Sequence, residues 1–78
     1  MRVYVLRSLR DGKRYVGITD NVAKRLRQHN RGEVTSTKGR RPFAVVYEEH
    51  VGDTAEGRAR EKYLKSAAGR RFLDDLNI

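Results

Sequence analysis

Residues 2–18, RVYVLRSLRDGKRYVGI, predict a β-hairpin close to the start of the chain. β-Branched and aromatic residues are spread through residues 2–8 and 13–18, as is typical of strands. Between them, Asp11-Gly12 favours a two-residue type I′ turn, because that turn needs positive φ at both central positions. The first two strands are therefore expected to be antiparallel neighbours.

Two tyrosines of this hairpin are expected to lie on one face of the sheet. With a two-residue turn, Arg10 pairs with Lys13, and even positions of the first strand then face odd positions of the second. Tyr4 then shares a face with Tyr15 and Gly17, while the valines between them take the opposite face. The hairpin geometry thus brings together two phenols that are eleven positions apart in the sequence.

The next segments predict a helix and a third strand. A helix is expected over residues 21–30, after N-cap candidates at residues 19–21 and before Gly32, a plausible helix-ending residue type. A polar loop over residues 33–41 leads to a strand over residues 42–48. That strand starts at a proline, where no ladder donor is needed.

The last third of the chain predicts two helices. Residues 53–56, Asp-Thr-Ala-Glu, form a capping-box pattern that opens a helix over residues 54–68. Gly69 is expected to end that helix, and residues 70–76 to form a short final one. The element order β-β-α-β-α-α predicts an α+β fold, in which a small three-stranded, mostly antiparallel sheet is flanked by helices.

Length and composition restrict the class of protein. Seventy-eight residues predict one domain over residues 1–78. The absence of cysteine excludes disulfides and thiolate metal sites, and fits a reducing cytoplasm. No apolar run approaches the ~20 residues that span a bilayer, so no membrane association is expected.

The charge distribution indicates a polyanionic partner. The formal net charge is +8, and residues 1–42 hold twelve Lys/Arg against three Asp/Glu, a net charge of +9. Residues 43–78 hold six against seven, a net charge of −1. Such an asymmetric field attracts polyanions, of which nucleic acid is the commonest.

Two helices carry the side chains that chemistry could use. Arg25 and His29 fall one turn apart on the stripe that also holds Val22 and Leu26. Glu61 lies at the edge of the apolar arc of the later helix. Structural alternatives are open for each: the tyrosines as sheet-core aromatics, the histidine as a core residue, the arginine as a solvated cation, and the glutamate as a carboxylate favoured by the helix dipole.

Phosphodiester hydrolysis needs a deprotonated water, a neutralised phosphoryl group and a stabilised leaving oxygen. The chain lacks the acidic cluster of a two-metal nuclease and the paired histidines of a metal-free ribonuclease. Any nuclease chemistry here would therefore depend on tyrosine, arginine and a single carboxylate.

The order and spacing of these motifs resemble the GIY-YIG nuclease family over nearly the whole chain. Val3-Tyr4-Val5-Leu6 and Tyr15-Val16-Gly17 are similar to the two halves of its signature. The later matches follow in order: Arg25-Leu26, His29-Asn30 and Gly32; Pro42 and Val46-Tyr47-Glu48; Glu61 and Leu64-Lys65. The length resembles the small stand-alone bacterial members, which consist of a single domain.

The resemblance implies the GIY-YIG endonuclease fold and a metal-dependent endonuclease. Its substrate would be nucleic acid, DNA in preference to RNA, cut with low sequence selectivity in DNA repair or recombination. The alternative is a nucleic-acid-binding module on the same fold that cuts weakly or not at all. Specificity would come from the basic face of the fold or from a partner protein.

The resemblance also implies a role for each site residue. One of Tyr4 and Tyr15 helps to deprotonate the attacking water and the other orients phosphate or water, with both assignments open. Arg25 would bind the scissile phosphate, and His29 would assist proton transfer or hold phosphate. Glu61 would be the only protein ligand of one Mg²⁺ or Mn²⁺ ion.

Some positions depart from the family pattern. Arg2 replaces the glycine expected two residues before Tyr4, and Ile18 replaces a lysine that some members carry. Asn77 is the only candidate for an asparagine that many members place after the glutamate.

Phosphate contacts are expected from four further cations: Arg14, Lys38, Arg40 and Arg41. Thr37 and Tyr47 are expected to line the groove.

Overall fold

The computed structural model describes all 78 residues. In chain order the elements are β1 (Arg2–Ser8), β2 (Arg14–Thr19), α1 (Val22–Asn30), a short 3₁₀ helix (Lys38–Arg40), β3 (Phe43–His50), α2 (Thr54–Lys65) and α3 (Ala67–Asp75). This order confirms the α+β class and the β-β-α-β-α-α arrangement predicted from the sequence.

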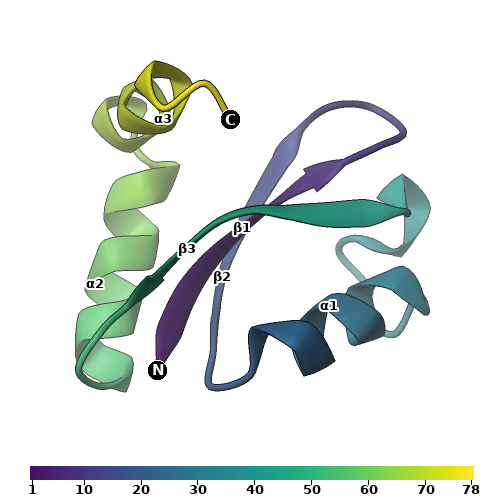
Figure 1. The fold of residues 1–78 in the computed structure, drawn as a ribbon, viewed down its shortest axis with the longest axis horizontal. Helices are drawn as coiled ribbons and strands as arrows, with labels where there is room; N and C mark the ends of the chain where they lie inside the picture. Colours follow the sequence, from purple (N-terminus) through teal and green to yellow (C-terminus); the bar gives the residue numbers. More distant parts are fainter.

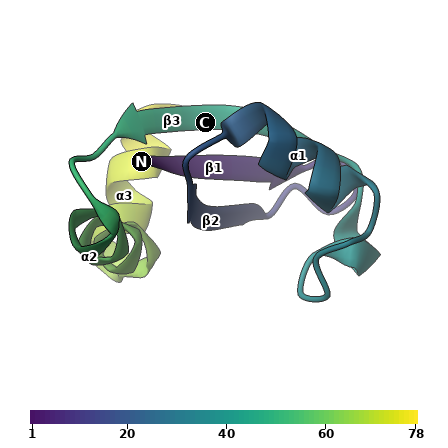
Figure 2. The same cartoon turned by 90° about the horizontal axis from the view of Figure 1, so that it is seen from below.

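The strands form one antiparallel sheet in the order β2-β1-β3, so β1 is central (Figure 1). Alternation along β1 sends Val3 to one face, where it packs with Leu64 of α2 and Leu73 of α3. Tyr4 points to the other face, where Leu26 of α1 joins its cluster. Figures 1 and 2 both show α1 on one side of the molecule and the α2–α3 pair on the other.

The register of the hairpin differs from the predicted one by two residues. The predicted pairing of Arg10 with Lys13 is wrong, because the backbone N–H of Ser8 donates to the carbonyl of Lys13 (2.9 Å). Tyr4 lies opposite Gly17 in the ladder. A shift of two residues leaves every side chain on its predicted face, whereas a shift of one would have reversed them.

The loop at residues 9–12 explains the register. Of its residues only Gly12 has positive φ (74°), so the predicted type I′ turn is wrong. The buried Ser8 hydroxyl organises the loop by accepting from the backbone N–H groups of Arg10 and Asp11, both at 3.1 Å. The same hydroxyl donates to the carbonyl of Arg40 (2.6 Å), which holds the hairpin against the 3₁₀ helix.

The boundary between the last two helices lies at Ser66, and the prediction that Gly69 ends the first of them is wrong. Ser66 has extended φ and ψ (−75°, 169°), and its hydroxyl accepts from the N–H of Gly69 (3.2 Å) as the N-cap of α3. Gly69 lies inside α3 and permits close packing. An added Cβ there would lie 2.0 Å from the carbonyl oxygen of Tyr63.

Polar contacts attach two of the helices to the edge strand β3. The side chain of Asn30 accepts from the N–H of Phe43 (2.7 Å) and donates to its carbonyl (3.1 Å). The end of α1 is thus hydrogen-bonded to the first residue of β3. On the other face, the guanidinium of Arg60 in α2 pairs with Glu49 of β3. These contacts fix both helices relative to the sheet.

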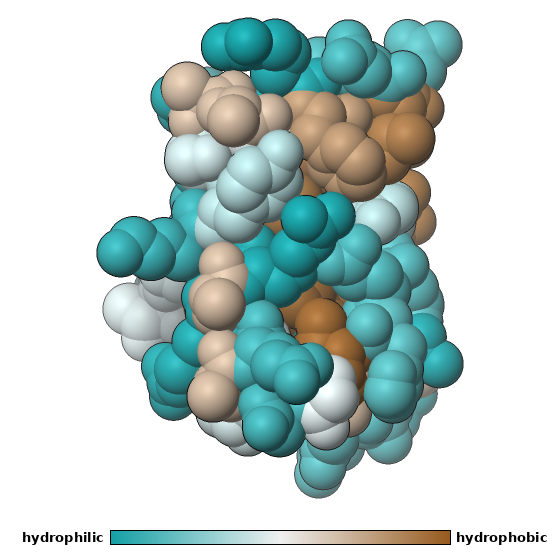
Figure 3. Space-filling view, turned by 90° about the vertical axis from the view of Figure 1, so that its left-hand side faces the viewer, coloured by the Kyte–Doolittle hydropathy of each residue, from teal (hydrophilic) through white to brown (hydrophobic).

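The surface on the α2–α3 side is mainly hydrophilic, with an apolar area toward the α3 end (Figure 3). None of the three α-helices combines the length and the apolar character that crossing a membrane requires.

Candidate active site

Three aromatic rings meet on the face of the sheet covered by α1. Tyr4 comes from β1, Tyr15 from β2 and His29 from α1. The ring centroids of Tyr15 and His29 are 4.9 Å apart, and those of Tyr4 and Tyr15 are 6.3 Å apart. The prediction that both tyrosines share one face is confirmed, and His29 completes the cluster.

Hydrogen bonds link this cluster into a chain. The Tyr4 hydroxyl lies 2.9 Å from Nε2 of His29, and Nδ1 of His29 lies 2.8 Å from the hydroxyl of Thr37. The Thr37 hydroxyl has a carbonyl acceptor in Val34 (3.4 Å). Tyr4 and His29 are only 1% and 0% exposed, so their polar atoms depend on these partners.

The available partners determine where the protons lie. We assign the Tyr4 hydroxyl as the donor to Nε2, because Thr37 has a carbonyl acceptor for its own hydroxyl proton and can therefore accept from Nδ1. Nδ1 then carries the imidazole proton and donates to Thr37, whose own hydroxyl proton points to the carbonyl of Val34. The chain therefore runs in one direction, from the phenol to a backbone carbonyl.

Burial sets the protonation states of this pair. Loss of solvent raises the pKa of Tyr4 above its usual 10, and the neighbouring Arg25 opposes only part of that rise. Loss of solvent lowers the pKa of His29 below 6.5, and the positive charge of Arg25 lowers it further. At neutral pH the phenol is protonated and the imidazole is uncharged.

The lowered pKa of His29 predicts a stability change with pH. The unfolded chain binds a proton at His29 near pH 6.5, whereas the folded chain resists it, so the free energy of unfolding should fall as pH drops below about 6.5, by up to ~1.4 kcal/mol per pH unit. Urea unfolding between pH 7.5 and 5.5 measures this slope. His29→Gln should flatten it, while His50→Gln, at the exposed second histidine, should keep it. Equal slopes in wild type and His29→Gln would contradict the assignment.

Gly17 makes room for the Tyr4 hydroxyl. A Cβ at Gly17 would lie 2.6 Å from that oxygen and 2.7 Å from the ring carbon that bears it. Since real Cβ contacts are longer, any other residue at this position would push the phenol away from His29. The glycine of the second motif is therefore a direct packing partner of the tyrosine of the first.

Arg25 and Glu61 lie at the border of the aromatic cluster. The half-buried Arg25 donates to the side chain of Gln28 (2.9 Å) and has no carboxylate partner, so its charge acts on Tyr4 and His29. The Glu61 side chain, 22% exposed, pairs with Lys65 (2.9 Å) and lies close enough to raise the pKa of Tyr4 slightly. The five predicted catalytic side chains thus come from four elements: Tyr4, Tyr15 and His29 are in contact, and the charges of Arg25 and Glu61 act on Tyr4.

A family model described as the GIY-YIG catalytic domain matches residues 1–73. The chain belongs to the GIY-YIG family. Similar proteins include the UPF0213 protein of Bacillus licheniformis, 41% identical over 76 residues, which are 92% of this chain and 77% of that protein. The UPF0213 protein of Staphylococcus haemolyticus is 37% identical over 72 residues, 91% of this chain and 87% of that protein.

A third relative is longer. The UPF0213 protein of Desulfotalea psychrophila is 37% identical over 71 residues, which are 88% of this chain but only 64% of that protein. The names of these bacterial relatives state no activity. No solved structure matches this GIY-YIG chain significantly.

GIY-YIG domains are typically metal-dependent. The single carboxylate of Glu61 suits an ion such as Mg²⁺. Nowhere in the chain do three His, Cys, Asp or Glu side chains converge as a metal-binding group. Mg²⁺ commonly binds one or two carboxylates and completes its shell with water and substrate phosphate. Glu61 is partly exposed and would fit this role once the ion replaced Lys65 as its partner. The chain has no group of side chains that could complete the coordination shell by itself.

Only some of the predicted phosphate contacts are free in this GIY-YIG domain. Arg14, with a side chain 19% exposed, pairs with Asp74 and donates to the carbonyl of Ile78 (2.8 Å). Arg40 pairs with Asp11 (3.2 Å). Both arginines therefore hold the hairpin in place. Their ion pairs do not support the expectation that they are available to bind phosphate.

The other two predicted contacts are exposed. Lys38 has no side-chain hydrogen bond or ion pair. Arg41 donates to the carbonyl of Lys38 (2.7 Å) and has no acidic partner. Both therefore keep their positive charge uncompensated at the surface.

Thr37 and Tyr47 do not lie where the sequence placed them, and Asn77 lies apart from the two tyrosines. Thr37 does not line a groove, because it is 0% exposed and hydrogen-bonded to His29. Tyr47 packs in the core of the opposite face, and its hydroxyl donates to Glu49 (2.5 Å). Asn77 is exposed beside Asp74 at the C-terminal end and is not brought to the tyrosine cluster. The fold of the loop after α1 explains the position of Thr37, and the alternation of side chains along β3 explains that of Tyr47.

Proposed function

We propose that this GIY-YIG protein is a divalent-metal-dependent endonuclease that hydrolyses phosphodiester bonds in nucleic acid. As part of the proposal, DNA is the preferred substrate over RNA, with low sequence selectivity, and DNA repair or recombination is the setting of the reaction. The observation that carries the proposal is the hydrogen bond from Tyr4 to an uncharged His29, beside an arginine and a carboxylate.

The proposed proton transfer uses this hydrogen bond. As water attacks the phosphorus, Tyr4 takes a proton from the water while its own proton moves to Nε2 of His29. A phenol with a raised pKa is a poor base alone, so the imidazole provides the basicity. After the attack the transfer reverses: Nε2 of His29 returns its proton to the Tyr4 oxygen as Tyr4 releases one to a water at the site, because both side chains are buried and exchange protons only through such a water.

The remaining side chains handle charge and position. Arg25, which has no carboxylate partner, would bind the phosphoryl oxygens and offset the charge that develops on them. The half-buried Tyr15 would orient phosphate or water at the opening of the cluster. A divalent ion held by Glu61 would supply further charge neutralisation on the phosphate.

A cleavage assay tests the proposal. Wild-type protein would be incubated with labelled single-stranded, duplex and branched DNA and with RNA, in Mg²⁺, in Mn²⁺ and in a chelator. We expect metal-dependent cutting, strongest on DNA, and its loss in Glu61→Gln. Glu33→Gln, at an exposed carboxylate on the loop after α1, is the matched control.

Two other outcomes have distinct meanings. Salt-sensitive binding without cutting on any substrate would support the alternative, a non-cleaving binding module. Equal cutting by the wild type and Glu61→Gln, purified identically, would indicate a contaminating nuclease and contradict the role of Glu61.

Thr37 is expected to affect cleavage through His29. Thr37→Val removes the hydroxyl that accepts from Nδ1, so the imidazole loses the partner that selects its tautomer. The loss of about one hydrogen bond predicts roughly 5- to 10-fold slower cleavage. Thr37→Ser should restore the rate, and ¹⁵N NMR of the imidazole should show Nδ1 protonated in wild type and Thr37→Ser. An unchanged rate and tautomer in Thr37→Val would exclude this positioning role.

A further inference from the structure

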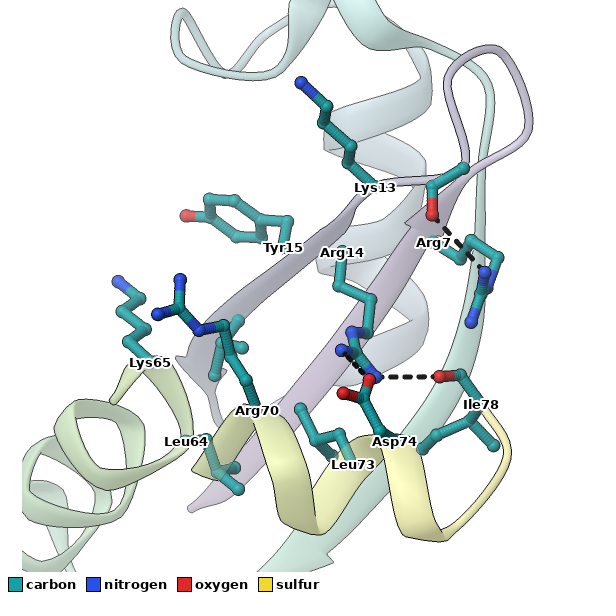
Figure 4. A pocket seen from close by; sticks show the side chains of 12 residues that line it. Arg7, Lys13, Arg14, Tyr15, Leu64, Lys65, Arg70, Leu73, Asp74 and Ile78 are labelled. Carbon is teal, nitrogen blue, oxygen red and sulfur yellow. Dashed lines mark hydrogen bonds and ion pairs between the residues drawn. The ribbon is translucent and has the colours of Figure 1, made fainter. Parts of the chain in front are cut away.

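A pocket of about 570 Å³ lies between the edge strand β2 and the α2–α3 corner (Figure 4). This volume is within the range of ligand pockets. Leu64, Leu73 and Val16 line its floor, and five cations surround it: Arg7, Lys13, Arg14, Lys65 and Arg70. Asp74 is the only acidic residue in the lining, so the pocket is strongly positive.

The cations of the pocket divide into braced and free ones. Arg14 is held by Asp74 and the carbonyl of Ile78, as the dashed lines in Figure 4 show, and it forms a fixed wall. Lys13 and Arg70 are exposed and make no side-chain hydrogen bond or ion pair. The braced arginine neutralises the only carboxylate, which leaves Lys13 and Arg70 uncompensated, while Arg7 donates to the carbonyl of Gly12 (3.3 Å).

The pocket adjoins the candidate active site. The Tyr15 side chain lines the pocket and also stacks edge to face with His29 (4.9 Å between centroids). Lys65, another lining residue, pairs with Glu61 (2.9 Å). In Figure 4 the polar ends of Tyr15, Lys65 and Arg70 project toward the same side of the opening. A ligand in the pocket would therefore lie next to whatever binds at the tyrosines.

We propose that this pocket is a subsite for the nucleotide that flanks the scissile phosphate on the same strand. Arg70 would bind its phosphate, and Lys13, on the other side of the Tyr15 ring in Figure 4, would contact the adjoining backbone. Arg14 and the Tyr15 ring would enclose its sugar. The inference rests on the proposed nuclease function and adds to it a defined path for the strand. Because backbone phosphate is recognised, the subsite would not select a base sequence.

The test measures binding as a function of salt in a Glu61→Gln background, where no cutting occurs. Arg70→Ala is compared with Arg71→Ala, an exposed neighbour on α3 that does not line the pocket. For an oligonucleotide of the type that wild type cuts, Arg70→Ala should reduce the slope of log K against log salt by about 1. Affinity should fall roughly 5- to 10-fold near 0.1 M salt, and Lys13→Ala should behave alike.

A neutral linkage locates the contact. Replacing the phosphate next to the scissile one by an uncharged methylphosphonate should weaken binding by the parent protein, whereas Arg70→Ala should be insensitive to the same replacement. Both flanking positions would be tried in turn. Insensitivity of the parent at both positions, or equal sensitivity of the parent and Arg70→Ala, would overturn the assignment.

The two proposals fail in different ways. If wild type cuts nucleic acid but Arg70→Ala binds like Arg71→Ala, the subsite is wrong and the nuclease function stands. If the protein neither cuts nor binds any of the nucleic acids, both proposals fail.

Discussion

Tyr4→Phe is expected to lower the rate of phosphodiester cleavage by about 10²- to 10⁴-fold, the usual contribution of a general acid–base group. The substitution keeps the ring in the aromatic cluster and removes only the oxygen that, in the proposed mechanism, links the water to His29. Binding of nucleic acid should change little, because the phenol contributes no charge. Single-turnover cleavage and anisotropy binding measure the two effects separately.

Tyr63→Phe is the matched control for this substitution. Its ring lies on α2, is 41% exposed and lines no part of the aromatic cluster, so the loss of its hydroxyl should leave cleavage unchanged. Tyr4→Phe also leaves Nε2 of His29 without a partner, at a cost of roughly 1–3 kcal/mol in unfolding free energy. Assays should therefore be run well below the unfolding temperature. A folded Tyr4→Phe protein that cuts at the wild-type rate would exclude Tyr4 as the proton acceptor.

Gly69→Ala is expected to destabilise the fold by ~3 kcal/mol or more, a large part of the ~4–12 kcal/mol typical for a chain of this length. The added Cβ would lie 2.0 Å from the carbonyl oxygen of Tyr63 and 2.4 Å from Cα of Leu64. Both are backbone atoms, so no side chain can rotate away. In an unobstructed helix the same change would stabilise by about 1 kcal/mol, so the sign of the effect depends on the packing of α3 against α2.

Gly39→Ala provides the control for this prediction. Gly39 has no heavy atom within 4 Å of the added Cβ and lies outside the positive-φ region, so the change should stay within ~0.5 kcal/mol. Urea unfolding of both variants beside wild type measures the difference. An unfolding free energy for Gly69→Ala equal to that of wild type would contradict the close contact between the two helices.

Local sequence signals predicted most of the fold correctly. The period-two pattern of the hairpin placed Tyr4 and Tyr15 on one face. That result did not depend on the exact turn, because a register shift of two residues leaves each side chain on the same face of the sheet. The capping residues Asn21 and Asp53 mark the helix starts, each accepting from a backbone N–H within its first turn. Such signals involve neighbours in the sequence, so they can be read without the fold.

The errors came from contacts between distant residues. The hairpin loop follows the Ser8 hydroxyl, which also donates to the carbonyl of Arg40, 32 residues away. Glycine is a typical helix terminator, but Gly69 is needed for the close approach of α3 to α2. The roles of Arg14 and Arg40 depend on Asp74 and Asp11, with which they pair only in the folded chain.

The sequence of this protein determined its element order, the shared face of the two tyrosines, the net positive charge of its first half and its family. These properties depend on residue type and short-range spacing. The tertiary structure decided that the pKa of His29 is lowered, that His29 is hydrogen-bonded to Tyr4 and Thr37, and which cations have no acidic partner. Those properties depend on loss of solvent and on partners many residues away, and a pKa or an ion pair exists only once the chain has brought its groups together.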